Sequence, residues 1–109
     1  MQKYPVRANH RANLQKESLR SLVRTHFESA DLHDEEVVTS YGAISVLRVA
    51  AEGRELKVEV SMNPKVPEEV ARETIRRYNE FLEDVTGYSS KERARKLRQA
   101  ATSSGSGEA

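Results

Sequence analysis

The clearest hydrophobic pattern in the chain is a strict alternation of apolar and polar positions over residues 55–62. Its apolar members are Leu56, Val58, Val60 and Met62. Successive side chains of a strand point to opposite faces of a sheet, so this period of two predicts a strand with one buried and one solvated face. Two more strands are predicted before it, over residues 37–41 and 43–51, with Gly42 between them and a turn at Glu52 and Gly53 after them. Three strands in this succession predict an antiparallel meander.

Two other segments repeat their apolar residues with the period of an α-helix. The first spans residues 13–28, begins with Asn13 as its N-cap, and has one apolar face: Leu19, Leu22, Val23, His26 and Phe27. The second has Pro67 in its first turn and Gly87 as its C-terminal cap. Its inward stripe is expected to be Ala71, Thr74, Ile75, Tyr78, Leu82 and Val85, with Val70 and Phe81 beside it.

Weaker signals mark the two ends of the chain and the connection after the first helix. Tyr4 and Val6 predict a short strand, which Pro5 restricts to a sheet edge because proline donates no ladder hydrogen bond. Residues 33–36 are polar and acidic and are expected to form an irregular connection. Ser89 and Glu92 have the spacing of a capping box, which predicts a third helix from residue 90 to about residue 101. Residues 102–109 are rich in Ser and Gly and are expected to be a disordered tail.

The expected fold class is therefore α+β, with the element order β-α-β-β-β-α-α. A three- to four-stranded antiparallel sheet is expected to carry the helices on one face, because the apolar side of each element needs cover. The length of 109 residues fits a single domain, which we expect to span residues 1–101.

Composition and motif content exclude several kinds of chemistry. The chain has no cysteine and therefore no disulfide, thiolate zinc site, iron–sulfur cluster or cysteine nucleophile. It contains no glycine-rich phosphate loop and no Gly-x-Ser-x-Gly motif. No apolar run approaches the length of a membrane span, and residues 1–20 lack the apolar segment of a signal peptide. We therefore expect a soluble, cytoplasmic, non-enzymatic protein without a cofactor, a metal or a small-molecule substrate.

The histidines and carboxylates form no recognisable catalytic or metal-binding motif. His26 lies on the apolar face of the first helix and is expected to be a half-buried packing residue. His33 lies near Asp31 and Asp34, but short side chains in an acidic turn imply no fixed coordination geometry. Most carboxylates alternate with Arg or Lys on predicted helix surfaces, which is typical of a solvent face. An enzyme would require a buried, perturbed carboxylate or histidine that the sequence does not reveal.

The distribution of charge gives the strongest functional lead. The net charge is +1, yet residues 1–30 carry six basic and two acidic side chains and residues 91–109 carry five and two. Like charges at helical spacing repel unless a counter-charge lies opposite. We therefore expect two basic helices to contact the phosphates of RNA or DNA without reading sequence. The predicted contacts are Lys16, Arg20, Arg24, Lys91, Arg93, Arg95, Lys96 and Arg98.

Two alternatives to nucleic-acid binding stay open. In the first, the basic ends pair with the acidic middle of the same fold, and the charge pattern has no ligand. In the second, the domain is a protein–protein or homodimerisation module. The thin apolar stripe of the last helix, namely Ala94, Leu97 and Ala101, supports the second alternative because it needs a partner surface.

Two stretches of the sequence resemble a known family. They are residues 40–43, with the sequence Ser-Tyr-Gly-Ala, and residues 76–93, from Arg76 through Thr86-Gly87-Tyr88 to Arg93. Over roughly residues 2–100 the chain is similar to an uncharacterised family of small archaeal proteins, a domain of unknown function. The resemblance implies a compact α+β domain of archaeal cytoplasm and supplies no catalytic residues. The α-β-β-β-α order is also similar to that of the double-stranded RNA-binding domain, although Glu68 and Glu69 stand where that domain carries basic residues.

Overall fold

Five antiparallel strands form one sheet in the spatial order β1-β5-β4-β3-β2. The strands are β1 (Gln2–Pro5), β2 (Asp31–His33), β3 (Glu36–Tyr41), β4 (Ile44–Glu52) and β5 (Glu55–Met62). The computed structural model describes residues 2–96 and 98. The predicted tail, residues 102–109, lies outside the described residues. The predicted meander is confirmed as β3-β4-β5, and β1 occupies a sheet edge, as Pro5 predicts.

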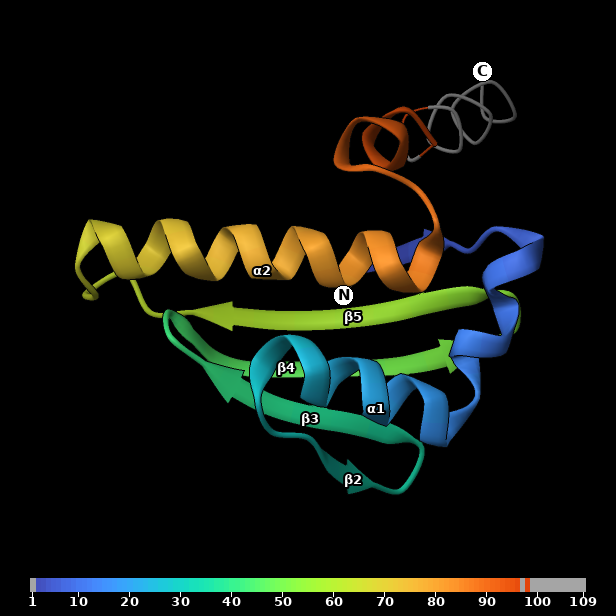
Figure 1. The fold of residues 1–109 in the computed structure, drawn as a ribbon, viewed down its shortest axis with the longest axis horizontal. Helices are drawn as coiled ribbons and strands as arrows, with labels where there is room; N and C mark the ends of the chain where they lie inside the picture. Colours follow the sequence, from blue (N-terminus) through green and yellow to red (C-terminus); the bar gives the residue numbers. More distant parts are fainter. Residues whose placement is uncertain (1, 97, 99–109) are drawn as a thin grey trace, which may run out of the picture.

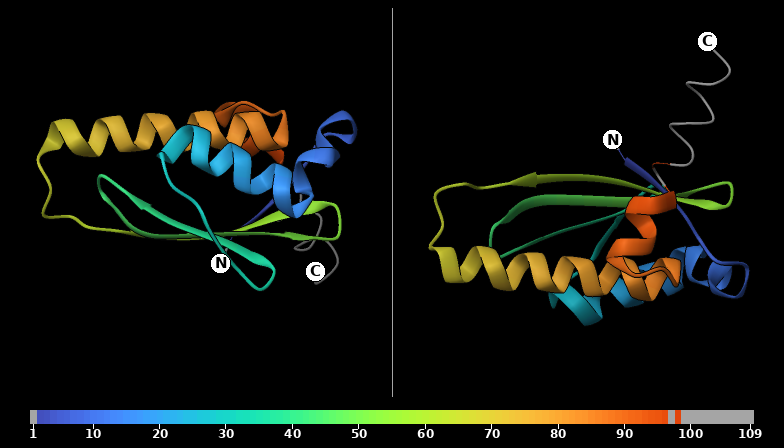
Figure 2. Two further views of the ribbon diagram at one scale, coloured as in Figure 1. Left: turned by 60° about the horizontal axis from the view of Figure 1, so that its bottom comes forward. Right: turned by 90° about the horizontal axis from the view of Figure 1, so that it is seen from above.

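The helices cover one face of this sheet. They are a 3-10 helix, η1 (Ala8–Leu14), and two α-helices, α1 (Lys16–Phe27) and α2 (Glu68–Thr86). Figure 1 shows α2 running along the sheet with α1 beside it, and Figure 2 shows both on the same side of the strands. Residues 90–96 form a further helical segment that leaves the end of α2 toward the β1 edge. The α+β class is therefore confirmed.

The sheet has five strands where three to four were expected, because residues 31–33, for which no strand was predicted, form β2. β2 pairs with β3 in the register Leu32 opposite Val37 and His33 opposite Glu36. Asp34 occupies the left-handed region at φ 55°, which closes a two-residue turn with Glu35. Leu32 is the only apolar side chain of this strand, and it packs against the core. A single apolar position gives no periodicity, so the sequence pattern did not reveal the strand.

The start of the first helix also differs from its prediction. Asn13 is not an N-cap: it lies within η1, and its side-chain Nδ2 donates to the Asp84 carbonyl oxygen at 3.0 Å. α1 begins at Lys16, with Gln15 as the N-cap residue. Pro67 similarly lies one position before the first turn, as the N-cap of α2. Gly87 ends α2 in the left-handed conformation, as predicted.

The core lies between the sheet and the two α-helices. Phe27 and Phe81 are at most 1% exposed, and their ring centroids are 5.4 Å apart in an edge-on arrangement. Each of these side chains contributes about 1.5–3 kcal/mol by burial. Leu56 and Val58 are buried against the helices, as predicted. The other residues of the buried cluster are Val6, Leu19, Val23, Ala30, Val37, Ile44, Leu47, Val49, Leu82 and Val85.

Gly42, at the tip of the β3-β4 hairpin, packs closely against α2. Its φ is 51°, and a β-carbon at this position would clash with the Thr74 side-chain oxygen. That oxygen accepts a hydrogen bond from the Ala43 backbone amide at 3.0 Å. The tip of the hairpin therefore approaches α2 so closely that the hairpin position fits glycine alone.

Candidate functional site

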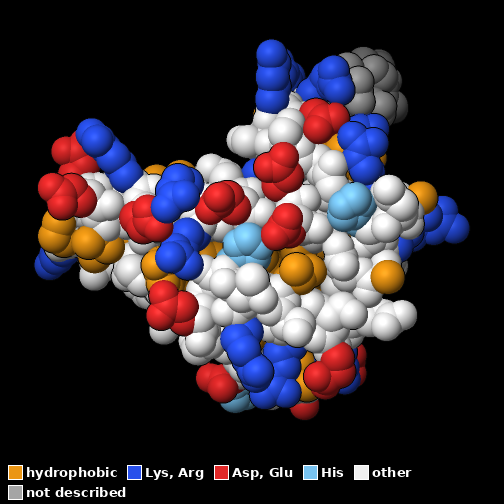
Figure 3. All heavy atoms as spheres, viewed as in Figure 1, with side chains coloured by type: hydrophobic (Ala, Val, Ile, Leu, Met, Phe, Trp, Pro, Cys, Tyr) orange, Lys and Arg blue, Asp and Glu red, His pale blue; other side chains and the backbone are white. Residues whose placement is uncertain are grey.

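The eight basic residues predicted to contact nucleic acid form two groups at opposite edges of the sheet. The group on α1 faces the β2 edge: Lys16 Nζ is 3.0 Å from Glu35 Oε1, and Arg20 Nε donates to the Ala30 carbonyl oxygen at 3.4 Å. Arg24 belongs to the same helix and is exposed. The group on residues 91–96 and 98 lies at the β1 edge (Figure 2). Figure 3 accordingly shows basic side chains gathered at the top and at the bottom of the molecule, with mixed charges along α2 between them. The structure therefore does not bring the two basic helices together.

Arg93 is a buried side chain with only 3% of its surface exposed. Its guanidinium donates to the Tyr88 carbonyl oxygen at 2.7 Å and to Asn79 Oδ1 at 3.2 Å, and it lies 5.9 Å from the centre of the Tyr4 ring. Burial lowers the pKa of Arg93, although an arginine remains protonated in proteins. In this fold the Arg93 side chain is enclosed and donates to protein acceptors, whereas a phosphate contact requires an exposed cation. The nucleic-acid contacts predicted for all eight residues stay a prediction.

The segment that follows α2 is held against the β1 end of the molecule. Ser89 and Glu92 form the predicted capping box: the Ser89 amide donates to Glu92 Oε1 at 3.0 Å, and the Glu92 amide donates to Ser89 Oγ at 3.2 Å. Arg7 adds an ion pair to Glu92 at 3.1 Å and lies over the Tyr88 ring at 4.5 Å. The hydrogen bond from the Ser89 amide is the main cause that lowers the pKa of Glu92. The first turn of this segment is thus fixed to the chain that follows β1.

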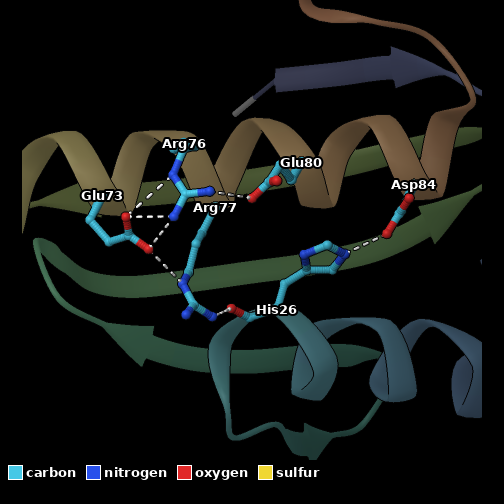
Figure 4. Close-up of polar contacts among 6 residues, drawn as sticks. All are labelled: His26, Glu73, Arg76, Arg77, Glu80 and Asp84. Atoms are coloured by element: carbon cyan, nitrogen blue, oxygen red, sulfur yellow. Dashed lines mark hydrogen bonds and ion pairs between the residues drawn. The ribbon is translucent and has the colours of Figure 1, made fainter.

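A row of polar side chains on α2 faces α1 (Figure 4). Glu73 receives hydrogen bonds from Arg76 at 2.7 Å and from Arg77 at 3.1 Å, and these bonds lower the pKa of the Glu73 carboxyl. Arg77 also donates to the His26 carbonyl oxygen at 3.0 Å and lies over the Tyr41 ring at 5.1 Å. Its contacts join the end of α1 to the β3-β4 hairpin. This row therefore holds the two helices and the hairpin in place.

His26 is the half-buried packing residue that its position on α1 predicts. Its side chain is 15% exposed, and its ring meets Phe81 edge-on with centroids 5.9 Å apart. His26 Nε2 is 2.6 Å from Asp84 Oδ2, so the imidazole also connects α1 to α2. Among the described residues, no hydroxyl group is hydrogen-bonded to this pair. The His26–Asp84 pair is accordingly a contact between helices.

A shallow cavity of about 270 Å³ lies between α2 and the tip of the β3-β4 hairpin. Its lining residues are Tyr41, Gly42, Glu69, Val70, Glu73 and Thr74. Glu73 is held ionised by its two arginines, and Thr74 Oγ1 is bonded to the backbone of Ala43 and Val70. Two of the polar groups of this cavity, Glu73 and Thr74, are therefore engaged with neighbouring residues of the fold.

A different surface is left open at the β1 edge, because β1 is much shorter than β5. β1 pairs with β5 only from Gln2 opposite Val58 to Pro5 opposite Glu55. Residues 59–62 of β5 consequently have β4 on one side and no strand among the described residues on the other. A hollow of about 220 Å³, lined by Gln2, Val58, Glu59 and Val60, marks the point where β1 stops.

Three apolar side chains accompany this open edge. Val60 and Met62 are 37% and 44% exposed, although the alternation of β5 predicts them as buried. Ile75, predicted on the inward stripe of α2, is 50% exposed. It lies one helical turn before Asn79, whose side chain meets Arg93 over β1, so Ile75 points toward the same edge. We call Val60, Met62 and Ile75, together with the backbone of residues 59–62, the β5 edge site.

Sequence reasoning missed the β5 edge site because hydrophobic periodicity shows which face a residue lies on and not how far the cover extends. One signal was available. The predicted strand around Tyr4 is about half as long as the apolar alternation of residues 55–62, so it covers only part of that strand.

The described residues contain no group of three or more His, Asp or Glu side chains placed to hold a metal ion. Within the same part of the chain, no helix combines the length and apolar character that crossing a membrane requires.

Comparisons with other proteins agree with the fold but do not assign an activity. Residues 1–99 match a family model described as "Domain of unknown function (DUF5611)". No curated protein matches the chain. The solution structure of a hypothetical protein from Thermoplasma acidophilum is similar to this fold, with a TM-score of 0.67 and 24% sequence identity over 89% of this chain and 97% of that chain. The similarity to an uncharacterised archaeal family, inferred from residues 40–43 and 76–93, is confirmed.

Proposed function

The chain belongs to the family of the domain of unknown function DUF5611, and on that premise we propose that it is a non-enzymatic protein-interaction module. Its docking surface is the β5 edge site, and it binds by adding a strand of a partner to the sheet. The sequence analysis left this role open as an alternative to nucleic-acid binding.

The observation that carries this proposal is the coincidence of an open strand edge with exposed apolar side chains. Within Glu59–Met62, the backbone groups of Val60 and Met62 face the β1 side, where no strand among the described residues pairs with them. Val60, Met62 and Ile75 are the three exposed apolar side chains that border this edge. An exposed edge supplies main-chain hydrogen bonds, and alternate side chains supply the apolar contact, as in other proteins that bind by strand addition.

The composition of the edge also supports binding. Natural proteins protect free edges with lysine, proline or a bulge. Between Val60 and Met62 the intervening residue is Ser61, whose small side chain lies on the opposite face. The register irregularity between β4 and β5 falls between Ile44 and Val46, on β4, which leaves β5 regular. Residues 60–62 therefore contain no lysine, proline or bulge that would hinder pairing, although the charged Glu59 and Pro64 flank them.

A titration followed by NMR tests this function. The ¹⁵N-labelled chain is titrated with an extended synthetic peptide in which valine alternates with threonine and lysine. Amide signals of Val60 and Met62 should shift and become protected from exchange, and those of β2, at the opposite edge, should not. A peptide of the same composition with proline at alternate positions serves as the control, because proline donates no ladder hydrogen bond. Equal shifts with both peptides, or no shift with either peptide at a protein concentration where the chain is monomeric, would exclude strand addition at this edge.

Nucleic-acid binding remains the second candidate, on a reduced set of residues. Lys91, Arg95 and Arg98 are exposed on the segment after α2, and Lys96 lies 5.2 Å from the centre of the Tyr88 ring. The carboxylate of that segment, Glu92, is engaged by the capping box and by Arg7. In this proposal the segment alone contacts a phosphate backbone, without the group on α1.

A further inference from the structure

The backbone groups that face the open side of β5 belong to Val60 and Met62. The Asn63 amide donates to the Ala43 carbonyl oxygen at 2.7 Å, on the side of β4. Backbone groups alternate in direction along a strand, so those of Glu59 and Ser61 face β4 like those of Asn63. Val60 and Met62 therefore direct their N–H and C=O groups toward the open edge.

An antiparallel copy of the same strand, centred on Ser61, satisfies all of these groups. In that register Val60 lies opposite Met62 of the second copy, and Met62 lies opposite its Val60. Each such pair exchanges two N–H···O bonds, and the Ser61 pair between them is a non-hydrogen-bonded pair. A register centred on Val60 would instead set Met62 against Val58, where β1 already pairs. The register centred on Ser61 is therefore the one that the open groups favour.

Side chains and charges agree with this register. Val60 and Met62 lie on the helix face of the sheet. In this register the exposed side chain of Val60 packs against Met62 of the second copy, and that of Met62 packs against its Val60. On the other face, Glu59 lies opposite Asn63 and Ser61 opposite Ser61, so no like charges meet. Pro64, in the turn toward α2, would lie opposite Val58 of the second copy. The β5–β5 pairing therefore ends before it reaches Val58, which already pairs with Gln2 of β1. The edge is thus complementary to itself.

Helix α2 lies on the same face and beside the same edge (Figures 1 and 2). The two-fold axis passes between the two Ser61 residues, perpendicular to the sheet. It places the α2 helices of the two copies antiparallel on that face. Ile75, 50% exposed, points toward the second copy in this arrangement. One symmetric contact thus uses all three exposed apolar side chains of the β5 edge site.

We infer that the partner at the β5 edge site is a second copy of this chain, joined to the first as an antiparallel β5–β5 pair in one continuous sheet. This inference rests on the proposed function, because it names the strand that the edge accepts.

Disulfide trapping tests the register. The chain has no cysteine, so Ser61→Cys introduces a single thiol on the two-fold axis. The α-carbons of a non-hydrogen-bonded antiparallel pair are about 4.5 Å apart, which a disulfide can span. Ser45→Cys is the matched control, because Ser45 is also an exposed serine but lies on β4, away from the edge. Ser61→Cys should form a covalent dimer at micromolar protein in a glutathione buffer, and Ser45→Cys should not.

Sedimentation equilibrium tests the apolar contact without cross-linking. Val60→Lys should raise the dimer dissociation constant by at least about tenfold, because the substitution acts twice in a symmetric interface and lysine protects edges. Val70→Lys is the matched control: Val70 is 36% exposed, as against 37% for Val60, but it lies at the cavity beside Gly42. Circular dichroism of both variants establishes that the comparison is between folded proteins.

The outcomes separate this inference from the function it rests on. A monomer at millimolar concentration, with Ser61→Cys no faster to cross-link than Ser45→Cys, overturns the second copy as partner. If the alternating peptide still shifts the amides of Val60 and Met62, the interaction role stands with a different partner. If a dimer forms but Val60→Lys and Val70→Lys weaken it equally, the copies meet elsewhere, and the inference fails.

Discussion

Arg93 Nη2 donates to Asn79 Oδ1 at 3.2 Å, and this contact joins the segment after α2 to the middle of α2 itself. The same guanidinium bonds to the Tyr88 carbonyl oxygen and lies over the Tyr4 ring. A buried charge usually has a charged partner. Among the described residues, the contacts of Arg93 are an amide, a carbonyl and an aromatic face, which together fix the segment against β1 and α2.

Replacing Arg93 by alanine should therefore loosen this segment. The substitution leaves the Tyr88 carbonyl and the Asn79 amide without their donor, which costs about 1–3 kcal/mol in the free energy of unfolding. Hydrogen exchange at residues 90–96 should accelerate more than exchange in β4. Arg95→Ala is the control, because Arg95 is exposed on the same segment and its loss should change the free energy of unfolding by less than about 0.5 kcal/mol. Equal effects of the two variants would contradict the anchoring role of Arg93.

Gly42 and Gly53 allow backbone strain to be separated from crowding. Both have positive φ, 51° and 62°, but a β-carbon at Gly53 meets nothing within 4 Å, whereas one at Gly42 meets Thr74 Oγ1. Gly53→Ala should cost about 1–2 kcal/mol of unfolding free energy, from the left-handed conformation alone. Gly42→Ala should cost more, because it also displaces the hairpin tip from α2. Urea denaturation of the two variants measures the difference, and a cost at Gly42 no larger than at Gly53 would show that the hairpin tip yields freely.

Glu92 should make the segment after α2 sensitive to acid. The capping box lowers the pKa of this carboxyl in the folded protein below its ordinary value of 4.5. Its contribution to stability is therefore fully present above about pH 4.5 and is lost as pH falls through the lowered pKa. The protection factors of the amides of residues 90–96, which correct for the intrinsic effect of pH on exchange, should be lower at pH 3 than at pH 6. Glu92→Gln keeps an acceptor for the Ser89 amide but has no titrating group, so it should remove the pH dependence that Glu92 contributes.

The second candidate function has a signature in salt dependence. Fluorescence anisotropy with duplex and single-stranded RNA and DNA, at two salt concentrations, measures binding. If the segment after α2 contacts phosphates, Lys91→Glu with Arg95→Glu should abolish binding and flatten the dependence on salt. Lys65→Glu is the control, because it reverses an exposed charge in the turn before α2. Absence of binding at low salt removes nucleic acid from the candidate partners.

The sequence predicted the elements whose signals are local. The capping box of Ser89 and Glu92, the turn at Gly53 and the helical end at Gly87 all appear as predicted, because each depends on a few neighbouring residues. The ion pairs Glu68–Arg72 and Glu73–Arg77, at 2.7 Å and 3.1 Å, are local in the same way, since helical spacing alone brings their side chains together.

The candidate site could not be predicted in the same way, because it depends on which elements meet. Val60 and Leu56 occupy equivalent positions in the alternation, but only Leu56 lies where β1 and the helices provide cover. Arg93 resembles its basic neighbours in sequence, yet it alone turns inward, toward Asn79 and Tyr4. Such differences arise from tertiary packing between segments far apart in the chain, which periodicity does not encode.

The unequal lengths of β1 and β5 also have a consequence for how the chain folds. β4 and β5 are joined through Gly53 and Arg54 alone, so this hairpin closes a short loop and can form early. β1 reaches its place only when residue 2 meets residue 58, after the intervening chain has been ordered. In that interval β5 is open along its whole length, and two unfinished molecules can meet by the same edge. The yield of refolding should therefore fall as protein concentration rises, even at concentrations where the native protein does not aggregate.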